Sequence, residues 1–153
     1  MSSPFHGFYS YFCRSVSKIS KKLIGFSKGV VVLNQLLLDS KSQLCQDFFE
    51  SVQTMCWLDG GHNGGKHTWL TDVTFLTDFS ERFKHIKIEI RVTPRQIEDE
   101  NRAWIGKEEA IFSATLLNLL GPSQVRRRVF FHDEKSLINH FRVLDTFEEL
   151  PLL

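Results

Sequence analysis

The sequence is short of net charge and of long apolar runs, and each shortage narrows the classes of protein to consider. The 19 lysines and arginines face 18 acidic residues, which leaves a formal charge of +1. A balance so close to zero offers no basic field for nucleic acid, so no nucleic-acid partner is predicted. No apolar run approaches the roughly 18 residues of a membrane-spanning helix, so no membrane span is predicted either.

Cysteine is also scarce. Cys13, Cys45 and Cys56 are odd in number and show no Cys-x-x-Cys spacing. This pattern favours reduced thiols in an intracellular compartment over a disulfide framework. With 42% hydrophobic residues and 14 phenylalanines among 153 positions, the chain has enough apolar material for one packed domain.

Acidic residues are missing from the N-terminal part of the chain, where the first carboxylate is Asp39. Residues 1–20 are rich in serine and aromatics and carry Arg14 and Lys18. This composition resembles an organelle transit segment. The alternative is a leader that is simply poorly ordered.

Residues 22–37 are the stretch around which the chain is organised. A short apolar strand (23–26) is followed by the pattern Gly-x-Ser-x-Gly and then by an apolar helix (29–38). This order predicts a nucleophile elbow that presents Ser27, with the backbone N–H of Lys28 as an oxyanion donor. We expect Gly25 and Gly29 to be required because strand and helix pass closely there. The alternative is a tight strand–helix turn with a surface serine.

The rest of the chain alternates strands with helices. Further strands are predicted at 53–58, 86–93 and 125–131, and further helices at 69–83 and 106–120, with a helix starting near residue 44, a loop at 95–105 and a short helix or turn at 133–140. Such alternation is typical of an α/β three-layer sandwich, with about four mostly parallel strands and helices on both faces.

Functional groups in parallel sheets gather beyond the carboxyl ends of the strands. A serine nucleophile needs a histidine base and a carboxylate that orients it, in the chain order Ser, acid, His for this fold type. His140, after the last strand, is the predicted base, and His132 is the alternative. Asp99 is the preferred acid, and Asp59 is the alternative.

A metal site is a weaker interpretation of the glycine-rich segment that follows the second strand. Asp59, His62 and His67 carry suitable ligand atoms. However, the intervening glycines would give such ligands no rigid support. We therefore predict neither a metal nor a cofactor.

Several longer stretches, taken together, carry a family resemblance. They are residues 23–37 (LIGFSKGVVVLNQLL), 54–65 (TMCWLDGGHNGG), 92–99 (VTPRQIED), 104–108 (WIGKE) and 139–143 (NHFRV). The chain resembles, over residues 23 to about 147, the mitochondrial α/β-hydrolase-like family named for human chromosome two open reading frame sixty-nine. The resemblance implies a serine hydrolase of the Ser-Asp-His type and a mitochondrial address, with a cytoplasmic one as the alternative. It supports Ser27, Asp99 or Asp59, and His140, and supplies no substrate.

The chain departs from the family at its N-terminal side, where family members have a long half that precedes the elbow. We therefore expect a leader at 1–20, the C-terminal half of an α/β-hydrolase-like domain at 21–147 and a tail at 148–153. The elbow strand would then be an exposed sheet edge.

Two functions follow from these expectations. The first is hydrolysis of an ester, thioester or amide of a small acyl substrate through a Ser27 acyl-enzyme. If only the C-terminal half of the domain is present, this truncation argues against full activity. The second is a non-catalytic module that docks on a partner protein at the exposed edge.

Overall fold

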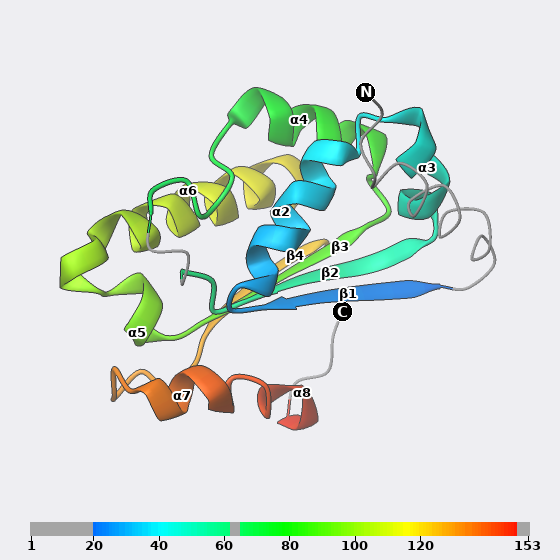
Figure 1. The fold of residues 1–153 in the computed structure, drawn as a ribbon. Coiled ribbons are helices and arrows are strands. Elements are labelled where there is room, and N and C mark those ends of the chain that lie inside the picture. The colour runs from blue at the N-terminus through cyan, green and yellow to red at the C-terminus, as the bar shows by residue number, and fades with distance from the viewer. Residues whose placement is uncertain (1–19, 62–64, 150–153) are drawn as a thin grey trace, which may run out of the picture.

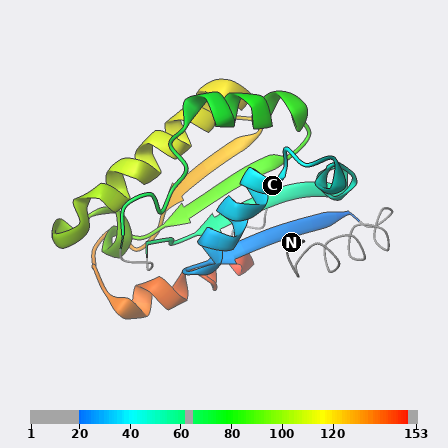
Figure 2. The ribbon, with the colours of Figure 1, turned by 45° about the horizontal axis from the view of Figure 1, so that its top comes forward.

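The computed structural model describes residues 20–61 and 65–149, in which four parallel strands form a single sheet (Figure 1). The strands are β1 (Lys21–Phe26), β2 (Val52–Leu58), β3 (Lys87–Val92) and β4 (Val125–Val129). Their order in the sheet follows the order in the sequence, β1-β2-β3-β4, and every neighbouring pair is parallel (Figure 2). The predicted α/β class with a parallel sheet is confirmed.

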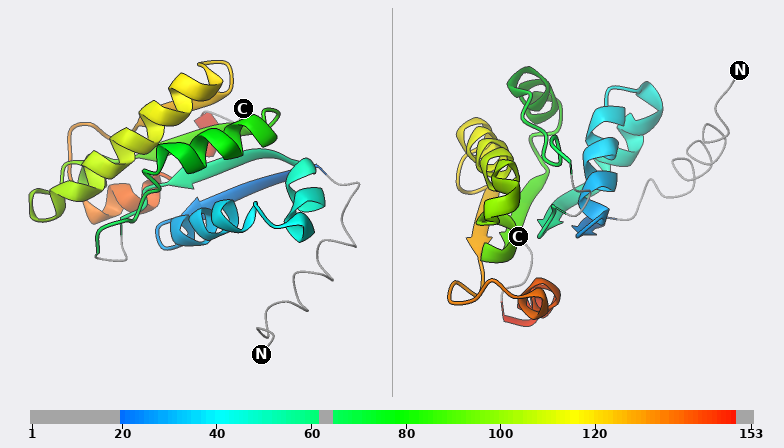
Figure 3. Two further views of the ribbon diagram at one scale, coloured as in Figure 1. Left: turned by 90° about the horizontal axis from the view of Figure 1, so that it is seen from above. Right: turned by 60° about the vertical axis from the view of Figure 1, so that its left-hand side comes forward.

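Helices cover both faces of the sheet (Figures 1 and 3). One face carries α2 (Gly29–Asp39), α3 (Gln43–Glu50), α4 (Val73–Arg82) and α6 (Ala103–Leu120). The opposite face carries two shorter helices, α7 (Leu137–Arg142) and α8 (Thr146–Glu149). None of the helices within 20–61 and 65–149 is long and apolar enough to cross a bilayer.

The larger core lies between the sheet and α2, α3, α4 and α6. Its fully buried aromatics include Trp57 on β2 and Phe112 on α6, whose rings meet edge to face at 5.2 Å between centroids. A smaller core lies under α7 and contains Cys56, Leu58 and Val143, with Phe26 packed against it. The two cores fix the sheet between the helical layers, and the smaller one positions α7 near the end of β1.

Strand β3 is buried on both faces although its sequence alternates apolar and charged residues. Ile88 and Ile90 join the larger core. On the other face, Glu89 and Arg91 are 1% and 0% exposed and form an ion pair at 2.9 Å. Arg126 of β4 also pairs with Glu89. Mutual pairing compensates the desolvation of these charges, so an alternating pattern here does not mean a solvated face.

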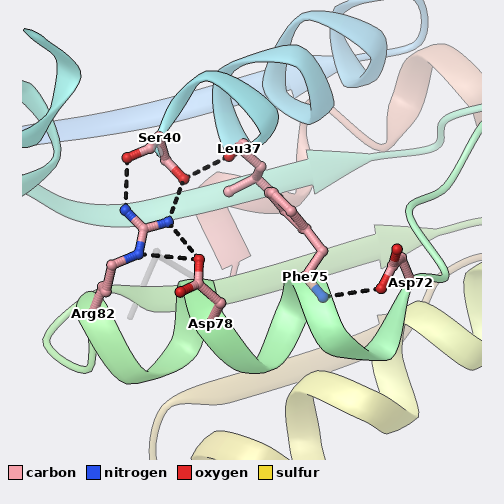
Figure 4. Close-up of polar contacts among 6 residues, drawn as sticks. All are labelled: Leu37, Ser40, Asp72, Phe75, Asp78 and Arg82. Carbon is pink, nitrogen blue, oxygen red and sulfur yellow. Dashed lines mark hydrogen bonds and ion pairs between the residues drawn. The ribbon is translucent and has the colours of Figure 1, made fainter. Parts of the chain in front are cut away.

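Helix α4 is fixed to the end of α2 by one arginine (Figure 4). Arg82 donates to the backbone carbonyl of Ser40 at 2.7 Å and to its hydroxyl at 3.2 Å. The same guanidinium pairs with Asp78 at 2.9 Å, one turn earlier on α4. At the other end of α4, the Asp72 carboxylate caps the helix by accepting from the N–H of Phe75 at 3.0 Å.

The prediction of a loop at 95–105 is wrong. Residues Pro94–Ile97 form a short helix, α5, and Glu100–Arg102 form a 3₁₀ turn, η1, before α6 begins at Ala103. Proline at the first helical position suits α5. The Asp99 carboxylate caps η1 by accepting from the N–H of Asn101 and of Arg102. Short capped turns carry little hydrophobic periodicity, which is why the pattern did not indicate them.

The predicted boundaries stay predictions. Residues 1–19 of the expected leader lie outside the described part of the chain, as do residues 150–153 of the expected tail. Helix α8 begins at Thr146, so the part of the chain that precedes the expected tail boundary is already helical.

Candidate functional site

Ser27 lies in a strained turn between β1 and α2. Its φ of 56° is in the left-handed region, which residues other than glycine seldom adopt. Its N–H donates to the carbonyl of Leu58 at 2.9 Å, which ties the turn to the end of β2. This is the strand–turn–helix geometry expected of a nucleophile elbow.

The two glycines of the elbow differ. A Cβ at Gly25 would lie 2.6 Å from the carbonyl oxygen of Gly29 and 2.8 Å from the side chain of Leu33, so only glycine fits there. A Cβ at Gly29 would meet nothing within 4 Å. The expectation of a close approach is therefore confirmed for Gly25 and wrong for Gly29, because the Gly29 Cβ position faces open space.

The start of α2 supplies backbone donors next to Ser27. The first amides bonded within this turn are those of Val30, to the carbonyl of Ser27, and Val31, to the carbonyl of Lys28. The N–H groups of Lys28 and Gly29 precede them, and helix N-termini favour anions because such groups lack an intrahelical acceptor. The Lys28 N–H therefore lies at the start of α2, directly after Ser27.

Asp59 directly follows β2 and is fully buried. Its φ of 45° turns the chain sharply, and its N–H donates to the carbonyl of Arg91 at 2.8 Å. Its carboxylate accepts two hydrogen bonds from Thr93, one from the N–H at 2.6 Å and one from the hydroxyl at 2.8 Å. Because Thr93 directly follows β3, the ends of two neighbouring strands hold this carboxylate in one orientation.

His140, on α7, contacts the same carboxylate. Its Nδ1 lies 2.7 Å from Oδ2 of Asp59, and its side chain is 2% exposed. A carboxylate on Nδ1 fixes the tautomer with the proton on that nitrogen, which makes Nε2 the basic atom. The imidazole stacks on Phe26, with 4.7 Å between ring centroids and 29° between planes. Since Phe26 precedes Ser27, the base candidate lies beside the elbow.

The preferred acid, Asp99, lies in a different setting. Besides capping η1, its carboxylate pairs with Arg102, which donates from Nε at 2.8 Å. Hydrogen bonding to Arg102 lowers the pKa of Asp99. The contact with His140 belongs to Asp59, the alternative acid. The alternative base, His132, is exposed in the turn after β4.

Sequence reasoning missed two residues of this cluster. Thr93 orients Asp59, and Phe26 packs against the imidazole. Thr93 had a usable signal, because it is the polar residue that ends a predicted strand and parallel strands end at the same edge of a sheet. Nothing in the sequence marked Phe26 as a site residue, because an aromatic residue in a strand usually belongs to the hydrophobic core.

The alternative metal interpretation finds no support in the cluster. His62 lies outside the described residues, and both carboxylate oxygens of Asp59 are engaged by Thr93, one of them also by His140. Within 20–61 and 65–149, no group of three or more histidine, cysteine, aspartate or glutamate side chains is arranged to hold a metal ion.

Comparison with known proteins agrees with the resemblance seen in the sequence. A family profile described as C2orf69 matches residues 6–120. The human protein named mitochondrial protein C2orf69 is 42% identical over 142 residues, and the mouse homologue is 44% identical over 138. The zebrafish homologue is 38% identical over 133 residues.

These matches cover 84–90% of this chain but only 36–38% of the relatives, so the chain spans little more than a third of their length. No solved structure matches the chain. The relatives' names confirm the predicted mitochondrial address. The profile match and the identities show that the chain belongs to the C2orf69 family of mitochondrial proteins.

Proposed function

We propose that this chain carries the catalytic groups of a serine hydrolase that cleaves an ester, thioester or amide. Ser27 is the nucleophile, His140 the general base and Asp59 the residue that orients His140. The backbone N–H of Lys28 stabilises the oxyanion. The substrate is a small acyl compound.

One observation carries the proposal. A buried carboxylate contacts the Nδ1 of a buried histidine at 2.7 Å, and that histidine stacks on the residue preceding a strained serine. Three segments that are distant in the sequence supply these groups. Core packing alone does not require a serine with a left-handed backbone conformation beside an oriented imidazole, whereas acyl transfer requires both.

The reaction follows from these positions. The Ser27 Oγ bonds to the substrate carbonyl carbon while its proton moves to Nε2 of His140, and the carbonyl oxygen becomes an oxyanion facing the Lys28 N–H. The bond to the leaving group then breaks, and the leaving group takes the proton from His140. Water attacks the acyl carbon, gives a proton to His140, and the acid leaves as Ser27 recovers that proton.

A fluorophosphonate probe tests the proposal on the full 153-residue chain. The probe phosphonylates an activated serine irreversibly, so even a slow site is detected after hours. We expect one adduct, mapped to Ser27 by mass spectrometry and absent in Ser27→Ala. Ser123→Ala, at an exposed turn before β4, should label normally. Absence of labelling in protein with native circular dichroism would overturn the assignment.

A second function is favoured by a separate observation. Among the described residues β1 pairs only with β2, so its outer edge is open. Ile24 on that strand is 49% exposed, and on α7 Ile138 is 71% and Phe141 55% exposed. Phe141 packs near Phe26 at 6.0 Å between ring centroids, so the apolar surface runs from the edge strand to the helix. Such a surface suits docking on a partner protein that adds a strand beside β1.

The docking function predicts poor behaviour of the chain alone. Purified chain should self-associate in sedimentation velocity, and Ile24→Lys should relieve the association because a charge on an edge strand opposes strand pairing. Thr74→Lys, at an exposed position on α4, is the matched control and should leave the association unchanged. A monodisperse monomer without any substitution would count against docking and leave the hydrolase proposal intact.

A further inference from the structure

The other edge of the sheet, formed by β4, lies beside a groove. Among the described residues β4 pairs only with β3, so the N–H and C=O groups on its outer side face away from the sheet. Helix α6 runs alongside this strand (Figure 3). The groove between them has a volume of about 500 Å³ and is lined by α6 and by the residues around β4.

The groove is apolar on its α6 side, where short side chains predominate, and basic along β4, where three arginines line it. Ala110, Ala114 and Leu117 line it from one stripe of α6, and Val125 closes it from β4. All three α6 residues are exposed. Two alanines one turn apart leave room for incoming side chains. A helix with small residues beside an open strand edge is an arrangement that accepts an extended peptide as an added strand.

The charges on β4 indicate which kind of peptide could bind at this edge. The edge strand carries Arg126, Arg127 and Arg128 in succession. On the groove side of the sheet, Arg127 pairs with Glu109 of α6 at 2.7 Å. On the opposite face, Arg126 pairs with Glu89. Because side chains alternate along a strand, Arg128 shares the face of Arg126. Within the described residues Arg128 makes no ion pair, and it is exposed.

A second copy of the chain is a poor occupant for this edge. Two β4 strands paired with one another would bring arginines of one copy against those of the other, and like charges opposite one another destabilise a strand pair. An acidic strand would meet the opposite charge instead. The charge pattern thus disfavours self-association and favours a strand with carboxylates on the Arg126 and Arg128 face.

We propose that the β4 edge and its groove bind an extended segment of a partner protein in which acidic and apolar residues alternate. The segment adds a fifth strand beside β4. Its carboxylates face Arg126 and Arg128, and its apolar side chains enter the groove between Ala114 and Val125. The backbone hydrogen bonds supply affinity, and the alternation supplies specificity. This interaction is independent of the chemistry proposed at Ser27.

Peptide binding to the full chain, measured by fluorescence anisotropy, tests the proposal. The probe is a fluorescein-labelled eight-residue peptide in which valine and glutamate alternate. A block peptide with the same four valines and four glutamates has the same charge but cannot place them on separate faces. We expect the alternating peptide to bind about tenfold more tightly than the block peptide, and a valine–lysine peptide not to bind.

Variants locate the site. Arg128→Glu reverses the exposed charge and should weaken binding at least about tenfold. Ala114→Phe fills the groove and should weaken binding without a change in charge. Lys22→Glu makes the same charge reversal on the opposite edge strand and should leave binding unchanged. Circular dichroism checks that each variant is folded. Equal affinity for the alternating and block peptides would indicate general electrostatics and overturn the proposal. So would a dimer of the chain that Arg128→Glu disrupts.

Discussion

Asp59 and His140 are 81 positions apart in the chain, and their side chains meet at 2.7 Å in the interior of the protein. Asp59 directly follows β2, and His140 lies on α7, which packs on the opposite side of the sheet from α2. The contact therefore joins α7, on one side of the sheet, to the end of β2. Ser27 lies at the same edge of the sheet, in the turn after β1. The carboxylate, itself held by Thr93, fixes the orientation of the imidazole.

Replacing Asp59 with asparagine should remove most of the reactivity of Ser27. Asparagine keeps the shape, but it no longer favours the proton on Nδ1 of His140, and in a serine protease the equivalent change lowers turnover roughly 10⁴-fold. We expect the rate of fluorophosphonate labelling to fall by several orders of magnitude in Asp59→Asn. Asp99→Asn is the matched control, because Asp99 contacts Arg102 instead, and it should label at the normal rate. Loss of labelling in Asp99→Asn alone would reverse the assignment.

The sequence was sufficient for the sheet and for the elbow, but not for the choice between two carboxylates. Ser27 is marked by glycines and by its place between a strand and a helix, which are local features. Asp59 and Asp99 both follow strands, so local features do not separate them. What separates them is Thr93, which holds Asp59, and Arg102, which engages Asp99. Partner contacts of this kind depend on the register of neighbouring strands and are visible only once the sheet is assembled.

The two glycines of the elbow should respond oppositely to alanine. In Gly25→Ala the new methyl would lie 2.6 Å from the Gly29 carbonyl oxygen, a backbone atom that cannot move without disturbing α2. We expect a loss of unfolding free energy of more than about 2 kcal/mol in urea denaturation. In Gly29→Ala the methyl enters open space and the helix gains a better helix former, so stability should change by less than about 1 kcal/mol. Equal losses in both variants would mean that the turn is not held as described.

The buried ion pair of β3 should be costly to break and cheap to replace. Arg91→Met leaves the buried Glu89 carboxylate short of a partner, and breaking such pairs typically costs about 3–5 kcal/mol. The double variant Glu89→Leu/Arg91→Met removes both charges. Arg126 then loses its pair with Glu89, but its side chain is 18% exposed and water can reach it, so the double variant should be more stable than Arg91→Met in urea denaturation. Lys135→Met breaks the exposed pair with Glu98 and should cost under about 1 kcal/mol. A double variant less stable than Arg91→Met would show that the pair itself stabilises the sheet.

Cys56 should make the stability of the protein sensitive to alkaline pH. Burial under α7 and, secondarily, the charge of Glu89 raise the pKa of this thiol from 9.0 to about 12. Between these two pH values the unfolded chain loses the thiol proton while the folded chain keeps it. Stability contributed by the neutral thiol is therefore full below about pH 9 and falls as the pH rises toward 12, by up to about 1.4 kcal/mol per pH unit.

Urea denaturation of the wild-type chain and of Cys56→Ala at pH 8, 9.5 and 10.5 measures this contribution. Cys56→Ala should be less stable at pH 8, because it leaves a small cavity, yet lose less stability as the pH rises. The thiol should also resist iodoacetamide at pH 8 until urea unfolds the chain, because the thiolate is the reacting form. Rapid alkylation of Cys56 in the folded protein would contradict both the burial and the pH dependence derived from it.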